Sequence, residues 1–138
     1  MNRGKRAAGA VVVRRTPDGW RYLLLRAFRN WDFPKGLIEP DESPLATARR
    51  EVAEETALAV EFPWGDGFRE TAPYAGGKIA RYYVAESAAG DPYLPVSAEL
   101  GRPEHHEFRW VTADDARRLL PPRLHDVLGW AQTVVEGT

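Results

Sequence analysis

Residues 36–58 read GLIEPDESPLATARREVAEETAL, and they carry the most specific pattern in the chain. The Ser-Pro pair at residues 43–44 predicts the start of a helix, because serine is a favoured N-cap and proline fits the first helical position. Inside that helix Glu51, Glu54 and Glu55 follow an i, i+3, i+4 spacing, which places three carboxylates on one face. Glu51 and Glu55 would repel each other by roughly 0.2–0.5 kcal/mol. A hard divalent cation would turn that repulsion into binding.

The same helix carries an apolar stripe. Leu45, Ala48 and Val52 recur at helical spacing, so we expect this side to pack on a sheet. The carboxylates lie off the stripe, and we expect them at the rim, where solvent and substrate reach them. A solvated charged helix, with Arg50 paired to Glu54, is the plainer interpretation of the same residues.

The spacing of the fixed positions resembles the Nudix box, G-x5-E-x7-R-E-U-x-E-E-x-G-U, in which U is aliphatic. Ala57 stands where that family has glycine, and we expect the backbone there to show little or no strain. So many joint matches are much more specific than a Glu-rich helix alone. The match holds at Gly36, Glu42, Arg50, Glu51, Val52, Glu54, Glu55 and Leu58.

Composition limits the possible classes of protein. The 138 residues suit one domain, residues 1–138, and 43% hydrophobic with 28% charged residues is typical of a soluble globular protein. With 0 cysteines the chain has no disulfide, no thiolate metal site and no cysteine nucleophile. The basic start is followed by a very short apolar run, so we expect neither a signal peptide nor a membrane span, and a cytoplasmic location.

The charge balance bears on the partners. The formal net charge is -1, whereas a protein that holds nucleic acid by bulk potential is usually basic. We therefore expect no nucleic-acid partner other than an RNA 5′ end acting as substrate. A polyphosphate would have to be attracted by metal ions and a few local Lys and Arg side chains.

Hydrophobic periodicity and turn residues outline the rest of the chain. Strands alternate with helices, which by pattern alone supports an α+β or a mixed α/β fold; the resemblance implies the α/β class, as a Nudix-type α/β/α sandwich with a mixed β-sheet. The expected elements besides the box helix are strands at residues 7–15, 22–26, 58–62, 68–73, 79–86 and 108–111, an irregular loop at 29–40, a helix capped by Thr112 and broken at 121–122, and a last amphipathic helix through 124–134.

The resemblance extends beyond the box, to the diadenosine polyphosphate hydrolase group. Residues 33–36 and 39–42 look like the start of the box in that group, and residues 79–86 resemble its nucleobase-binding strand. Residues 104–105 and 108–110 are similar to a distal loop and strand.

The resemblance implies a metal site on the box helix. Glu51 and Glu55 are then metal ligands, Glu54 is a third, and the carbonyl of Gly36 adds a backbone oxygen. The expected cofactor is Mg²⁺, for which Mn²⁺ can substitute. Mg²⁺ keeps several waters, so the protein does not have to fill its coordination sphere.

Two residues of the box are better interpreted as supports for the ligands. Arg50 lies one helical step from the metal face and can pair with Glu54 or Glu42, orienting a carboxylate. We expect Glu42 to have a scaffold role as well. Lys35 either contacts a phosphate or is an ordinary exposed lysine.

The catalytic base stays open between Glu51 and Glu104, while Glu55 is expected to be catalytic through the metal. His105 is expected near a phosphate. His106 follows it and would face the other way in a strand, so we expect no separate histidine metal site.

Tyr82 either stacks on a purine or packs in the core, and Tyr83 faces the opposite side of the strand. Base stacking on Tyr82 would contribute about 1–3 kcal/mol.

Taken together, the sequence predicts an Mg²⁺-dependent Nudix hydrolase that cleaves dinucleoside polyphosphates, converting diadenosine tetraphosphate to ATP and AMP. The alternative is hydrolysis of nucleoside triphosphates or of 5′-triphosphorylated RNA. A catalytically silent binding domain is a third possibility, which retention of Glu51, Glu54 and Glu55 argues against. The oligomeric state is left open.

Overall fold

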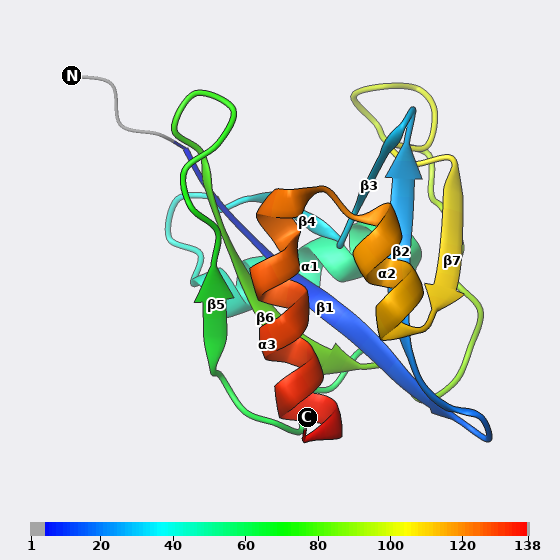
Figure 1. Ribbon diagram of the computed structural model, residues 1–138. Coiled ribbons are helices and arrows are strands. Elements are labelled where there is room, and N and C mark those ends of the chain that lie inside the picture. The colour runs from blue at the N-terminus through cyan, green and yellow to red at the C-terminus, as the bar shows by residue number, and fades with distance from the viewer. Residues whose placement is uncertain (1–4, 138) are drawn as a thin grey trace.

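The computed structural model describes residues 5–137. A single mixed sheet lies at the centre, and helices cover both of its faces (Figure 1). In chain order the elements are β1 (Arg6–Thr16), β2 (Gly19–Ala27), β3 (Asn30–Asp32), β4 (Lys35–Leu37), α1 (Pro44–Thr56), β5 (Phe68–Glu70), β6 (Ile79–Glu86), β7 (Glu107–Val111), α2 (Ala113–Leu119), the 3₁₀ turn η1 (Pro122–Leu124) and α3 (His125–Glu136).

Strand β1 organises the sheet. The strand order is β3-β2-β1-β6-β5, while β4 pairs with β1 and β7 pairs with β2. β1 runs parallel to β6, with Gly9 opposite Tyr82, and the other pairs are antiparallel. The predicted mixed sheet is therefore confirmed.

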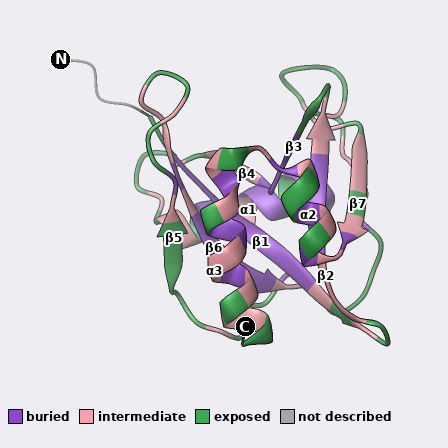
Figure 2. Ribbon diagram, viewed as in Figure 1, coloured by how far each residue is buried: buried purple, intermediate pink, exposed green. Residues whose placement is uncertain are grey.

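The pleat of β1 divides the core into two layers. Val11 and Val13 point to one face and pack with α2 and α3, whereas Ala10 and Val12 point to the other face and pack with Val52 of α1. Figure 2 shows the buried residues of the strands lying between these helices. The α/β/α layering follows from this double burial, because each face of the sheet needs its own cover.

Helix α1 begins as the sequence predicts and ends in a way it does not. The Ser43 hydroxyl accepts a hydrogen bond from the Ala46 N–H at 3.1 Å, and Pro44 occupies the first helical position. The helix ends at Ala57, whose φ of 60° and ψ of 13° are left-handed. The expectation of little or no strain at Ala57 is therefore wrong, because its Cβ crowds the following carbonyl there.

Two further expectations about local structure are also wrong. Residues 58–62 form no regular strand, because Leu58 and Val60 pack into the α1 layer and the segment pairs only through a bridge between Glu61 and Glu86. Residues 29–40 are more ordered than an irregular loop, since they contain the short strands β3 and β4.

The C-terminal helices match their sequence signals. Thr112 caps α2 by accepting a hydrogen bond from the Asp115 N–H at 3.2 Å, and Asp114 and Asp115 lie in its first turn. The proline pair at residues 121–122 ends that helix before α3 begins. Among the described residues, no helix is long and apolar enough to cross a bilayer.

Candidate active site

The carboxylates of the box helix differ in exposure. Glu54 is 57% exposed at its side chain, whereas Glu51 and Glu55 are buried, with 9% and 6% of their surface exposed. The expectation that all three lie at the rim therefore holds only for Glu54. Gly36 of β4 lies against Glu51, and His105 lies against Glu55, so the neighbouring segments cover two of the three.

Arg50 is the hub of the first half of the site. Its Nε lies 2.7 Å from Glu42 Oε2, and its Nη1 lies 2.9 Å from Glu51 Oε2 and 3.1 Å from Glu54 Oε2. The predicted pairing with Glu42 and Glu54 is thus present, and Glu51 joins it. Hydrogen bonds from Arg50 and Thr47 lower the pKa of Glu42 to about 2. This network fixes the carboxylate orientations before any ligand arrives.

Gly36 is required for a steric reason. A Cβ built on Gly36 would overlap the Glu51 carboxylate, so only glycine lets β4 approach α1 this closely. Gly36 also pairs with Ala8 of β1, which fixes its position in the sheet. The box glycine therefore holds backbone next to the buried carboxylate of Glu51.

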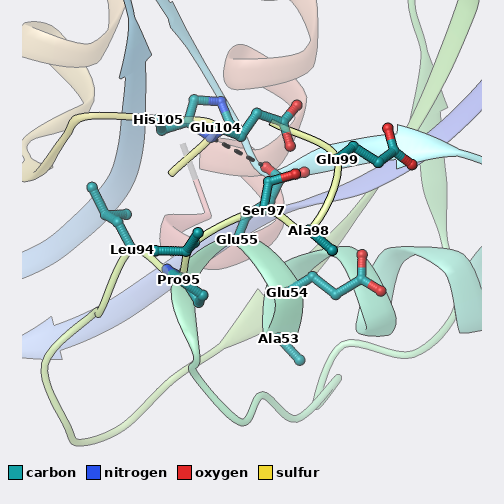
Figure 3. Close-up of a pocket in the computed structure, with 11 residues that line it drawn as sticks. Ala53, Glu54, Glu55, Leu94, Pro95, Ser97, Ala98, Glu99, Glu104 and His105 are labelled. Atoms are coloured by element: carbon teal, nitrogen blue, oxygen red, sulfur yellow. Dashed lines mark ion pairs between the residues drawn. The ribbon is translucent and has the colours of Figure 1, made fainter. Parts of the chain in front are cut away.

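Three side chains of types that can hold a metal ion, here called the metal-ligating group, meet at the C-terminal end of α1. Glu55, Glu104 and His105 each offer an atom within 4.8 Å of the others (Figure 3). Both Glu55 oxygens are buried, and among residues 5–137 neither has a hydrogen-bond partner. Burial, with the nearby carboxylates of Glu51 and Glu104, raises the pKa of Glu55 well above its ordinary value. An unpartnered buried carboxylate is costly unless a cation or a proton neutralises it.

The histidine of this group is neutral. Burial, together with the charge of Lys35, lowers the pKa of His105 to about 4. Its Nδ1 lies 3.7 Å from Glu55 Oε1, too far for a hydrogen bond. His106 points elsewhere, since its Nε2 accepts a hydrogen bond from the Phe28 N–H at 2.6 Å. One histidine thus joins the box carboxylates, and its neighbour does not.

These residues fit a divalent cation. Glu55 supplies two buried oxygens without partners, Glu104 supplies a further carboxylate and His105 a neutral imidazole nitrogen. Carboxylate oxygens are the ligands that hard cations prefer. This cluster therefore has the charge and the unsatisfied oxygens for a divalent metal.

Lys35 belongs to a buried polar cluster beside the metal-ligating group. Its side chain is 20% exposed, with Nζ 3.4 Å from Asp32 Oδ2, so it is not an ordinary exposed lysine. Asp32 also accepts hydrogen bonds from Arg123 at 2.9 Å and from the Tyr82 hydroxyl at 3.1 Å. Burial opposes the charge on Lys35, but Asp32, and to a lesser degree Glu55, raise its pKa overall.

Sequence reasoning missed the other members of this cluster. Arg123 lies over the ring of Tyr74 at 4.2 Å, and the Lys78 Nζ lies 6.0 Å from the same ring. Burial and the charge of Lys35 lower the pKa of Lys78. Lys35, Lys78 and Arg123, here called the cationic cluster, come from β4, the turn before β6 and η1, so no local spacing relates them.

Tyr82 is a core residue. The pleat of β6 directs it to the α3 face of the sheet, away from α1, where it is 0% exposed and packs edge-to-face on Phe33. Its hydroxyl is bonded to Asp32. Of the two alternatives left open for Tyr82, the structure has the core position and not purine stacking, because neither face of its ring is free. Tyr83 faces the opposite side, as predicted, and is also buried.

A cavity of about 460 Å³ opens beside the metal-ligating group (Figure 3). It lies between the end of α1 and the segment 94–105, and it shares Glu55, Glu104 and His105 with that group. The remaining lining residues are Ala53, Glu54, Leu94, Pro95, Val96, Ser97, Ala98 and Glu99.

Comparison with known proteins agrees with this geometry. The NUDIX domain profile matches residues 4–131. The asymmetrical bis(5′-nucleosyl)-tetraphosphatase of Sus scrofa is 35% identical over 127 residues, covering 83% of each chain, and that of Rattus norvegicus is 32% identical with the same coverage. The fold resembles that of the C. elegans Ap4A hydrolase in a binary complex, with a TM-score of 0.83 and 23% identity over 97% of this chain and 99% of that one. The chain belongs to the NUDIX family.

Proposed function

We propose that this protein is an Mg²⁺-dependent hydrolase of dinucleoside polyphosphates that splits diadenosine tetraphosphate into ATP and AMP. The observation that carries the proposal is the buried carboxylate of Glu55, which has no partner of its own and meets Glu104 and His105. The names of the Sus scrofa and Rattus norvegicus relatives supply the substrate class. We further propose that residues 1–138 act as one domain and that the protein is cytoplasmic.

The metal would be held by the carboxylates of the box helix. We assign Glu51, Glu54 and Glu55 as ligands, with the Gly36 carbonyl beside them and with Glu104 and His105 closing the site. When bound, Mg²⁺ neutralises phosphoryl charge and lowers the pKa of water, and Mn²⁺ can supply the same chemistry. The Arg50 network supports this assignment, because it holds Glu51 in one orientation.

The cationic cluster would receive the polyphosphate. Lys35, Lys78 and Arg123 gather around a single carboxylate, Asp32, which leaves positive charge for a ligand. Positive side chains placed next to the reacting phosphate stabilise the charge of the transition state. His105 was expected near a phosphate; because it is neutral at pH 7, we assign it a metal or hydrogen-bond contact there.

Glu104 is the better candidate for the general base. Glu51 is buried and bonded to Arg50, whereas among residues 5–137 the Glu104 carboxylate makes no hydrogen bond or ion pair. Partial burial and the carboxylate of Glu51 raise the pKa of Glu104, which strengthens it as a proton acceptor. We propose that Glu104 accepts a proton from the attacking water.

The alternative substrates are nucleoside triphosphates and 5′-triphosphorylated RNA. A relative named RNA pyrophosphohydrolase, from Erythrobacter litoralis, is 25% identical over 119 residues. The net charge of -1 argues against RNA, because no bulk positive potential would hold the rest of the strand.

A substrate panel tests the proposal. With Mg²⁺, kcat/KM should be higher for diadenosine tetraphosphate than for ATP or a triphosphorylated RNA, and chromatography should show equal amounts of ATP and AMP. Activity should vanish in excess EDTA. Equal or better kcat/KM for a nucleoside triphosphate would favour the alternative, and full turnover in EDTA would refute the metal mechanism.

A further inference from the structure

We propose that the cavity beside Glu55 binds the nucleoside of the half that leaves as a mononucleotide, while the phosphate chain extends from it toward the cationic cluster. The inference rests on the proposed function, because it concerns the orientation of the same dinucleoside polyphosphate. The group that this cavity recognises is a nucleobase carrying an amino group.

The cavity has the size and the apolar walls of a small-molecule site. Its volume of about 460 Å³ falls within the range of roughly 300–1,000 Å³ that such sites occupy. Leu94, Pro95, Val96 and Ala98 line one side, and Ala53 of α1 lines the other. An aromatic ring placed between these side chains would bury its apolar surface away from water, and no charged group of the ring would have to be desolvated.

The charges of the lining exclude a phosphate and favour a neutral group with donors. Glu54, Glu99 and Glu104 contribute carboxylates, and the lining contains no Lys or Arg. A phosphate placed away from the metal would meet only repulsion. The amino group of a base such as adenine would instead donate hydrogen bonds to a carboxylate. We assign that contact to Glu99, which lies on the segment facing α1 (Figure 3).

The metal-ligating group joins this cavity to the cationic cluster. Glu55 and His105 line the cavity, whereas Lys35 does not line it and precedes Gly36, which lies against the carboxylate of Glu51 on the same helix as Glu55. A ligand that runs past Glu55 therefore meets carboxylates and apolar walls in one direction and cations in the other. A nucleoside with a phosphate tail has this polarity. Because the cavity shares Glu55, Glu104 and His105 with the metal-ligating group, it suits the nucleoside that one phosphate separates from the cleaved bond, which is that of the mononucleotide half.

The segment that forms the wall is held in place by its backbone. The Tyr93 N–H donates to the carbonyl of Thr56 at the end of α1, at 2.8 Å. The Ser97 N–H donates to the Arg102 carbonyl at 2.9 Å, and the Gly101 N–H donates to the Ser97 carbonyl at 2.8 Å. The wall is thus tied to the helix that carries the metal-ligating carboxylates, which fixes the distance between nucleoside and reacting phosphate.

Adenosine binding without metal tests the cavity directly. In EDTA, adenosine titrated into the wild-type protein should shift the amide resonances of Val96, Ser97 and Ala98, and Ala98→Trp should abolish saturation by filling the space. Ala59→Trp, which adds the same bulk at an exposed site outside the lining, should bind as the wild type does. Shifts confined to Tyr74 and Lys78, or no shifts at all, would overturn the assignment.

A base comparison tests the contact with Glu99. Glu99→Gln should weaken adenosine binding by about 2- to 10-fold while leaving inosine, which lacks the amino group, nearly unchanged. Glu61→Gln is the matched control, because Glu61 is an exposed carboxylate outside the lining. Equal loss for both nucleosides would refute the amino contact.

Kinetics separates this inference from the proposed function. Ala98→Trp should lower the ratio of kcat/KM for diadenosine tetraphosphate to that for adenosine tetraphosphate at least 10-fold, whereas Ala59→Trp should leave that ratio unchanged. An unchanged ratio in Ala98→Trp would overturn the inference while the proposed function stands. A wild type that binds adenosine in the cavity but cleaves neither compound would refute the proposed function alone.

Discussion

The two ends of helix α1 carry similar side chains in opposite electrostatic states. Near its start, Glu42 accepts hydrogen bonds from Arg50 and from the Thr47 hydroxyl, the latter at 2.6 Å. Near its end, Glu55 and Glu104 face each other, and Glu55 has no hydrogen-bond partner among the described residues. The first end is completed by folding itself, while the second is left for a ligand to complete.

This difference separates scaffold from chemistry within one helix. Charge-assisted hydrogen bonds at the Arg50 end stabilise the fold with or without a metal. The Glu55 end opposes folding when no cation is present, because a buried carboxylate without partners is unfavourable. A protein keeps such a feature where function needs it.

The largest expected effect comes from substituting Glu55, the buried carboxylate without a hydrogen-bond partner among the described residues. Glu55→Gln removes the ligand charge with little change in volume, so kcat should fall by more than the ~10–100-fold that loss of a supporting group costs. Its melting temperature in EDTA should be equal to or above that of the wild type, because the buried charge is gone. Steady-state kinetics and thermal melts measure the two effects, with Glu61→Gln as control. A near wild-type kcat would show that Glu55 is not a ligand.

Substituting Arg50 at the other end of the helix should lower the stability of the protein, which Glu55→Gln should not do. Arg50→Ala leaves Glu42, Glu51 and Glu54 without their shared cation, so Tm should fall by ~5–10 °C and kcat by about 10–100-fold. Arg50→Lys keeps the charge but loses the fork that reaches several carboxylates at once, and should recover only part of both. Thermal melts and kinetics on the two variants decide this. An Arg50→Ala protein as stable as the wild type would mean that the network is not a scaffold.

The response to pH sharpens the comparison, because the two ends should titrate with opposite sign. Glu42 has a folded pKa of about 2, below its ordinary 4.5; its stabilisation is present above about 4.5 and is lost as pH falls toward 2. Glu55 has a raised folded pKa. The stability it contributes is complete below its unfolded value and is lost as pH rises through the folded pKa.

Unfolding experiments without metal measure how the Glu55 contribution to stability depends on pH. Above the ordinary histidine pKa of 6.5, the stability of the wild type in EDTA should decline as pH rises through the folded pKa of Glu55, and Glu55→Gln should flatten that decline. Glu104 also has a raised pKa, so part of the slope should remain in the variant. Lys35 stays charged and adds no slope, whereas His105 adds a slope of the opposite sign between about pH 4 and 6.5, because its folded pKa of about 4 lies below its ordinary value of 6.5. A stability that still rises with pH above 6.5 in EDTA would contradict the assignment.

The part of the site that lies within the box helix could be predicted from the sequence. The box has fixed spacing, so helix geometry alone brings Glu51, Glu54 and Glu55 together and places Arg50 within reach of Glu54. Apolar periodicity alone supports an α+β or a mixed α/β fold, and the α/β/α layering was predicted from the resemblance to the Nudix family.

The other half of the site depends on contacts distant in sequence. Glu104 and His105 were candidates by type, but their meeting with Glu55 depends on the path of a segment without regular structure. Asp32 and Arg123, separated by 91 positions, carry no pattern that relates them. The sequence allowed Tyr82 to lie either in the core or in the substrate site. Only the register of β6 against β1 shows that it lies in the core.

The smallest effect concerns the last residue of the box helix, Ala57, where the sequence departs from the family pattern. Its φ of 60° and ψ of 13° are left-handed, and its N–H still donates to the Ala53 carbonyl at 2.9 Å as a helix cap. Glycine adopts this conformation without a Cβ penalty, so Ala57→Gly should stabilise the protein by about 1 kcal/mol. Ala53→Gly, at an exposed interior position of the same helix, should destabilise it by a similar amount. Urea unfolding of both variants measures the pair, and the opposite signs separate cap geometry from helix propensity. Ala57 lies two residues past Glu55, and Ala57→Gly should leave kcat unchanged. That result would show that alanine at this position affects backbone strain and not the chemistry at Glu55. Destabilisation by Ala57→Gly would mean that the chain continues as helix through Ala57 in solution.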